Sequence, residues 1–146
     1  DTAALKRAED THGITTVHCD LNDEWPFETG AYDVVVACEF LEHIYFPEQV
    51  MQKAKVLLKD DGMFIGTVPH AFSLQSRIKL LFGTKHGTPL EDPTHINHFT
   101  KSEFEAMLQR NFTDVQMEAW TPTRYALFAK LFPFLFAHDL LFVARR

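Results

Sequence analysis

The sequence predicts an α/β fold with a mostly parallel sheet, and three observations support this. Residues 32–38 are apolar on both faces, which is typical of a parallel strand covered by helices on each side. A second buried strand is expected at residues 63–68, and a helical apolar stripe over residues 47–58 separates the two. Strands that alternate with helices in this way pair in parallel through right-handed crossovers.

Upstream of these elements, the chain begins with a helical pattern over residues 2–11. Residues 14–19 contain the β-branched Ile14 and Val17, and they predict a short strand. A polar loop over residues 20–31 then leads to the strong strand signal described above.

The central helix is expected to begin at Pro47, because a proline at the first helical position loses nothing through its missing N–H. Residues 59–62 predict a turn before the second buried strand, and residues 72–82 predict a helix. Residues 83–98 form a long irregular stretch, and loops of that length inside a domain are more often functional than not.

The C-terminal part begins with a capping box, in which Thr100 and Glu103 satisfy each other's free backbone N–H groups at the start of a helix. Alternating apolar residues over 115–119 then predict a strand, and residues 140–144 predict a last one. The aromatic segment 125–137 lies between these two strands in place of a regular crossover helix.

The composition limits the classes of function. The chain has 146 residues, which is the length of a single domain. Its net charge of −6 argues against nonspecific binding to nucleic acid. Cys19 and Cys38 lie in apolar runs and are expected to be buried free thiols, which indicates a reducing, cytoplasmic location. The start is polar, unlike a signal peptide, and charges within residues 128–144 argue against a transmembrane segment.

Residues 31–44, AYDVVVACEFLEHI, closely resemble the fourth strand and following loop of class I S-adenosylmethionine-dependent methyltransferases. Further matches keep the family's order and spacing, so the resemblance spans essentially the whole chain. These matches are Asp20 with Trp25-Pro26-Phe27 in the loop after the third strand, residues 57–63 before the fifth strand, residues 93–100 at the entry to the penultimate helix, and residues 142–145 in the closing strand.

The resemblance implies a Rossmann-like sheet, mostly parallel with an antiparallel last strand. The family's first strand and glycine-rich loop, which hold the methionine moiety of the cofactor, have no counterpart in this sequence. Residues 1–146 are therefore expected to form a single, N-terminally truncated methyltransferase domain that lacks N-terminal strands. Five strands are readable where the family has seven.

The resemblance also implies S-adenosylmethionine as the cofactor. Adenine needs an acceptor for its exocyclic amine and a donor for the neighbouring ring nitrogen, and the Asp20 carboxylate and the Leu21 N–H offer both. Glu39 is expected beside the cofactor. The alternative for Asp20 is a structural one, in which its side chain only caps its own turn.

Histidines supply the candidate catalytic and substrate-lining groups. His43, just after the fourth strand, and His95, in the long loop, are the expected catalytic residues, since a near-neutral pKa suits an acid–base role. His70 and His98 are expected to line the acceptor site. Each histidine has a structural alternative, as a side chain that only orders its own loop.

A metal site is the second interpretation of the same segment. Glu39, Glu42 and His43 resemble the E-x-x-E-H metal site of some family members, including the ubiquinone-pathway O-methyltransferases, with His95 as the natural fourth ligand. Metal-free relatives carry the same LEH string. We therefore predict a site without metal and keep the four-ligand set as the alternative.

The predicted function is methyl transfer from S-adenosylmethionine to an oxygen or nitrogen atom of a small-molecule acceptor. The alternative is a non-catalytic, methyltransferase-like module that binds a partner through residues 125–137. This aromatic segment is expected to pack in the core, and the other interpretations are an acceptor channel, a homodimer interface or a membrane-surface contact.

Overall fold

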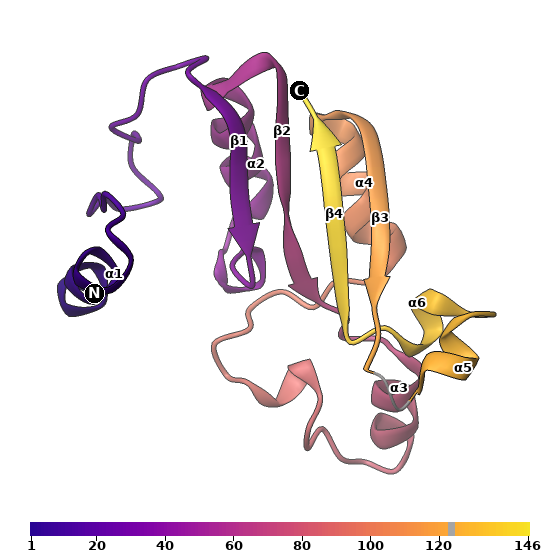
Figure 1. Cartoon of the computed structure of the whole chain (residues 1–146). Helices are drawn as coiled ribbons and strands as arrows, with labels where there is room; N and C mark the ends of the chain where they lie inside the picture. Colours follow the sequence, from indigo (N-terminus) through magenta and orange to yellow (C-terminus); the bar gives the residue numbers. More distant parts are fainter. Residues whose placement is uncertain (123–124) are drawn as a thin grey trace.

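The computed structural model describes residues 1–122 and 125–146, and four strands of this part form one mixed sheet. The strand order is β1-β2-β4-β3 (Figure 1). β2 pairs in parallel with β1, while β4 lies antiparallel to both β2 and β3. The predicted α/β class with an antiparallel last strand is therefore confirmed. The bounds are β1 (Tyr32–Cys38), β2 (Leu58–Pro69), β3 (Thr113–Trp120) and β4 (Asp139–Arg145).

Two helices, α2 (Pro47–Leu57) and α4 (Lys101–Asn111), pack behind the sheet on one face (Figure 1). The core lies between them and the sheet, where the Phe104 and Phe64 rings lie 5.3 and 5.1 Å from the ring of Phe142. Both helices begin where the sequence predicted, α2 at Pro47 and α4 with the capping box of Thr100.

The opposite face of the sheet has no helix packed on it in the described part of the chain (Figure 1). Val34 and Val36 on β1 are 39% and 60% exposed, so the prediction that this strand is covered on both faces is wrong. Cys38 is exposed as well, although both cysteines are free as expected. The sequence signal failed because an apolar run shows that two faces can be buried, without showing what covers them.

The helix α1 (Thr2–His12) is capped at its N-terminus by Asp1, whose carboxylate accepts a hydrogen bond from the Ala3 N–H at 2.9 Å. The strand predicted at residues 14–19 is wrong, since this segment is irregular and leaves Ile14 52% exposed. A strand needs a neighbour for its N–H and C=O groups. β1 pairs only with β2, so the described chain offers residues 14–19 no such neighbour.

The predicted turn at residues 59–62 is also wrong, since these residues belong to β2. They bulge out of the pairing, because Tyr32 pairs with Leu58 but Val34 pairs with Met63. The bulge is held by the C-terminal residue, as the Arg146 N–H donates to the Gly62 carbonyl at 3.0 Å.

The carboxyl ends of β1, β2 and β3 meet a group of short elements (Figure 1). The predicted helix over residues 72–82 and the irregular stretch over 83–98 are confirmed, the latter with one short 3-10 helix at Pro89–Glu91. No helix of the described residues is long and apolar enough to cross a bilayer. The helices at this end of the sheet are α3 (Leu74–Leu81), α5 (Ala126–Ala129) and α6 (Pro133–Phe136).

We predict that Gly66→Ala strongly destabilises the domain, because Gly66 lies opposite Ala37 in the β1–β2 pair. A Cβ at Gly66 would stand 1.8 Å from the Ala37 carbonyl oxygen and 2.9 Å from the Phe142 ring. Urea unfolding should show a loss of about 3 kcal/mol or a failure to fold. Gly13→Ala, which places its Cβ in open space at φ +63, should lose only about 1 kcal/mol, and equal losses would contradict this account.

Candidate active site

The candidate site starts where β1 ends. Glu39 follows the strand with a φ of 48°, and its N–H donates to the Thr67 carbonyl of β2 at 3.1 Å. Left-handed backbone at a residue other than glycine is uncommon and costs energy, and it is found disproportionately at functional sites. The chain then turns through a short 3-10 helix, Leu41–His43, which carries the predicted Glu-His pair.

Several hydrogen bonds fasten the turn after β1 to the long loop, and we call the three that end on backbone carbonyls of the turn the loop clamp. The Glu42 carbonyl accepts from the N–H groups of both Ile96 and Asn97, each at 2.9 Å. The Asn97 side-chain amide donates to the Ile44 carbonyl at 2.5 Å. Residues more than fifty positions apart in the chain are thereby held side by side.

The loop clamp brings the two predicted catalytic histidines together, with their ring centroids 4.8 Å apart. His43 Nδ1 lies 3.0 Å from the Thr94 carbonyl, and His95 Nδ1 lies 2.8 Å from the Pro89 carbonyl. A carbonyl only accepts, so in neutral rings these contacts assign the proton to Nδ1 and leave the Nε2 lone pairs free. His43 Nε2 lies 3.6 Å from Glu42 Oε1.

The Glu42 side chain is 1% exposed, and neither carboxylate oxygen has a hydrogen-bond partner among the described residues. Burial raises the pKa of this carboxyl, since it disfavours the charged form, and the nearby Glu39 charge adds to the shift. Buried polar groups are nearly always partnered, so this carboxylate is a candidate for contact with a bound ligand or ion. Sequence reasoning placed Glu42 in the alternative metal set and otherwise expected it to cap the next helix, but α2 begins after Phe46 with no side-chain cap.

Glu42, His43 and His95 could hold a divalent cation. Each offers one ligand atom, and the three atoms lie within 4.8 Å of one another. One carboxylate and two imidazoles are a donor set that zinc and other first-row metals accept. Glu39, the fourth member of the alternative metal set, lies outside this group.

An open cavity of about 580 Å³ lies beside the histidine pair, at the carboxyl ends of the strands. The sequence did not predict Asp139 there, because only the antiparallel pairing of β4 places it opposite Pro69 at the end of β2. Carboxylates dominate the charge of the lining, and the described lining residues include no lysine or arginine. The lining includes Glu39, Pro69, Pro89, Asp92, His95 and Asp139.

Asp20 and Leu21, the predicted adenine-binding pair, lie on the loop before β1 and do not line this cavity. Asp20 Oδ1 accepts from the backbone and side-chain amides of Asn22, both at 2.9 Å, and these bonds lower the pKa of Asp20. Lys53 fixes the loop to α2 by donating to the Leu21 carbonyl at 2.8 Å. Among the described residues nothing bonds Asp20 Oδ2 or the Leu21 N–H, so the groups that adenine needs stay available.

The structure separates the two predicted substrate-lining histidines from this cavity. His70 is 5% exposed, accepts from the Phe72 N–H at 3.3 Å, and lines a second cavity of about 260 Å³ with Arg77. His98 Nε2 is buried without a partner among the described residues. Burial lowers the pKa of both imidazoles. Their contact with an acceptor stays a prediction.

The raised pKa of Glu42 predicts a pH-dependent stability. The folded state keeps this proton to a higher pH than the unfolded chain does, so the free energy of unfolding should fall as pH rises from the ordinary glutamate pKa through the raised one. Urea unfolding across this range should show that Glu42→Gln removes the fall. Glu103→Gln is the opposite control. Hydrogen bonds with Thr100 lower the Glu103 pKa, so the stability that Glu103 contributes to the fold is lost as pH falls. Identical profiles for the Glu42→Gln and parent chains would contradict the assignment.

Comparison with known proteins identifies the family. Residues 4–116 match the family model described as a methyltransferase domain. No curated protein matches the chain.

Solved structures share the fold. A SAM-dependent methyltransferase from Archaeoglobus fulgidus aligns with a TM-score of 0.71 and 18% identity, over 100% of this chain and 73% of that one. A putative S-adenosylmethionine-dependent methyltransferase from Listeria monocytogenes aligns at 0.67 and 20% identity, over 100% and 76%. A possible histamine N-methyltransferase from Thermotoga maritima aligns at 0.69 and 11% identity, over 96% and 69%. With its family match, its sheet order and its site at the strand ends, the chain belongs to the methyltransferase-domain family and is an S-adenosylmethionine-dependent methyltransferase.

Proposed function

We propose that this enzyme methylates an oxygen or nitrogen atom of a small molecule bound in the cavity beside His95. The observation that carries the proposal is the position of this cavity, at the carboxyl ends of the strands and against the histidine pair. In open α/β sheets, ligands bind at this edge.

The charge of the cavity favours a cationic or neutral acceptor over an anionic one. Glu39, Asp92 and Asp139 supply carboxylates to its wall, and the described lining has no lysine or arginine to offset them. An amine would be attracted, whereas a carboxylate or phosphate would be repelled. The Thermotoga maritima neighbour, a possible histamine N-methyltransferase, is consistent with an amine acceptor.

The cofactor would be held by groups on two loops. Asp20 Oδ2 and the Leu21 N–H would pair with the adenine edge, and Glu39 would lie beside the reacting end of the molecule. When bound, S-adenosylmethionine supplies an electrophilic methyl group on a sulfonium sulfur. The protein then contributes mainly by holding the acceptor in line with that group.

His95 is the proposed general base. Its side chain is 14% exposed and lines the cavity, and the Pro89 carbonyl fixes the ring so that Nε2 can accept the acceptor's proton. His43 packs against it and lies next to the buried Glu42 carboxyl, which would stabilise the charge that the pair gains with the proton. A well-placed base contributes roughly 100-fold or more to the rate.

The second candidate mechanism uses a divalent cation on Glu42, His43 and His95. The specific observation in its favour is the pair of buried, unpartnered oxygens of Glu42, which a cation would satisfy. Such an ion would orient an oxygen acceptor and would leave His95 as a ligand rather than a base.

Calorimetric titration with S-adenosylhomocysteine tests the cofactor site. We expect binding that Asp20→Ala weakens roughly tenfold or more, because a hydrogen bond to a charged group is lost. Asp23→Ala is the matched control on the same loop, whose contact with Lys53 uses only its backbone carbonyl. An absence of binding, or equal weakening by both variants, would overturn the proposed adenine site.

Methyl-transfer assays with a panel of small amines and phenols separate the two mechanisms. If His95 is the base, His95→Gln should lower kcat roughly 100-fold with little change in S-adenosylhomocysteine affinity, and EDTA should have no effect. If the cation mechanism is correct, EDTA should abolish activity and Mn²⁺ should restore it. Full activity of His95→Gln, with or without EDTA, would contradict both.

A further inference from the structure

An apolar surface lies at the same end of the sheet as the cavity. α3 and α6 pack against each other there, and the Tyr125 hydroxyl hydrogen-bonds to Gln75 of α3 at 3.3 Å (Figure 1). Six large apolar side chains, at residues 81–82 and in the α5–α6 segment, are each at least 57% exposed, and we call them the α3/α5 surface. They are Leu81, Phe82, Leu127, Phe128, Leu131 and Phe132.

This exposure corrects the expectation that the aromatic segment packs in the core. Phe134 does pack against the core, and Phe136 stacks near Tyr125 and Phe128. Four of the segment's large apolar side chains, Leu127, Phe128, Leu131 and Phe132, are nevertheless each at least 57% exposed. Monomeric proteins rarely leave so many large apolar side chains exposed unless the surface binds something.

The charge of the two segments that carry the α3/α5 surface differs in sign from the charge of the whole chain. Residues 72–90 and 121–138 contain five of the fourteen lysines and arginines and none of the twenty aspartates and glutamates. The chain as a whole has a net charge of −6. The apolar side chains therefore lie in two segments with a net positive charge, and Glu91 follows directly after the first of them.

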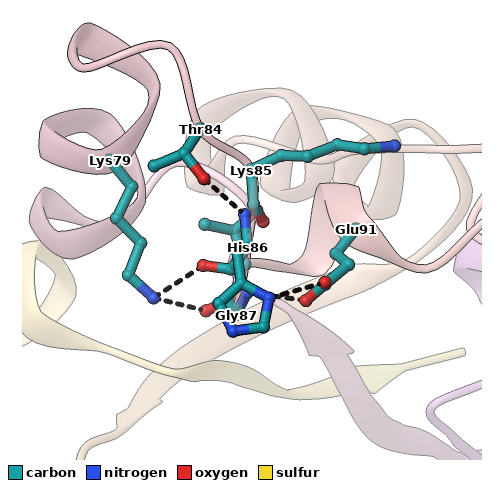
Figure 2. Close-up of polar contacts among 7 residues, drawn as sticks. Lys79, Thr84, Lys85, His86, Gly87 and Glu91 are labelled. Carbon is teal, nitrogen blue, oxygen red and sulfur yellow. Dashed lines mark hydrogen bonds and ion pairs between the residues drawn. The ribbon is translucent and has the colours of Figure 1, made fainter.

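The basic side chains of α3 and its following loop have different roles. Lys79 folds back onto the loop and donates to the carbonyls of His86 and Gly87 at 2.9 and 3.0 Å (Figure 2). Glu91 holds the same loop through His86 and the Gly87 N–H. Lys85 is an exposed residue of the same loop, and its side chain makes none of the hydrogen bonds drawn (Figure 2).

We propose that the α3/α5 surface docks on an anionic lipid bilayer. Exposed leucine and phenylalanine side chains can enter the headgroup boundary, and Lys85 and Lys130, which are exposed in the same two segments, would be attracted to anionic lipids. A second copy of the chain fits less well, because two pairs of segments with a net positive charge would face each other. Since the cavity lies at the same end of the sheet, docking would hold its mouth close to the membrane.

Vesicle co-sedimentation tests the proposal. The chain should sediment with vesicles of phosphatidylcholine and phosphatidylglycerol, sediment much less with phosphatidylcholine alone, and be released by high salt. The double variant Leu81→Glu/Leu131→Glu should lose sedimentation, and it should fold normally because these side chains are 82% and 76% exposed. Lys85→Glu should weaken binding by roughly fivefold or more.

Two matched variants control for general effects. Val56→Glu changes a half-exposed apolar residue on α2, and Lys6→Glu changes an exposed lysine on α1, so both should bind vesicles like the parent chain. Failure of the parent chain to bind the anionic vesicles would overturn the proposal. Equal losses in the control variants, or a dimer in light scattering that only Leu81→Glu/Leu131→Glu dissociates, would overturn it as well.

Discussion

The backbone carbonyl of Glu42 is the point on which the candidate site depends. It accepts two N–H groups from the long loop, and the Asn97 amide adds a third bond to the same turn. Ordering a loop costs about 1–2 kcal/mol per residue in backbone entropy, and each hydrogen bond returns only about 1 kcal/mol. The three bonds therefore matter chiefly because they fix one arrangement of the loop, with His95 against His43.

The sheet supplies the other half of the site. Parallel strands deliver Glu39 and Pro69 to one edge, and the antiparallel β4 brings Asp139 to the same edge from the opposite direction. The wall of the cavity is therefore acidic because of the topology. The histidine pair lies beside this wall, and His43 of the pair lies next to the buried Glu42 carboxyl. The apolar α3/α5 surface lies at the same end of the domain, on segments with a net positive charge, so the cavity and this surface favour different partners.

Much of the fold could be predicted from local sequence signals, because those signals act over a few residues. The apolar run of β1, the proline that begins α2 and the capping box of Thr100 each specify their own element. Residues 14–19 have a weaker strand pattern that also predicts a strand, but a strand forms only with a neighbour. The exposure of the aromatic segment also depends on distant packing, which no local pattern records.

The candidate site was predictable in its residues but not in their environment. The resemblance pointed to Glu39, His43 and His95, whereas the burial of Glu42 and the position of Asp139 follow from long-range pairing.

Hydrogen exchange at the amides of Ile96 and Asn97 tests the central claim most directly. The loop clamp predicts that both exchange far more slowly than ordinary loop amides and that Asn97→Ala speeds exchange at residue 96 while α4 stays protected. Fast exchange at both amides in the parent chain would show that the loop is not clamped and would contradict the account.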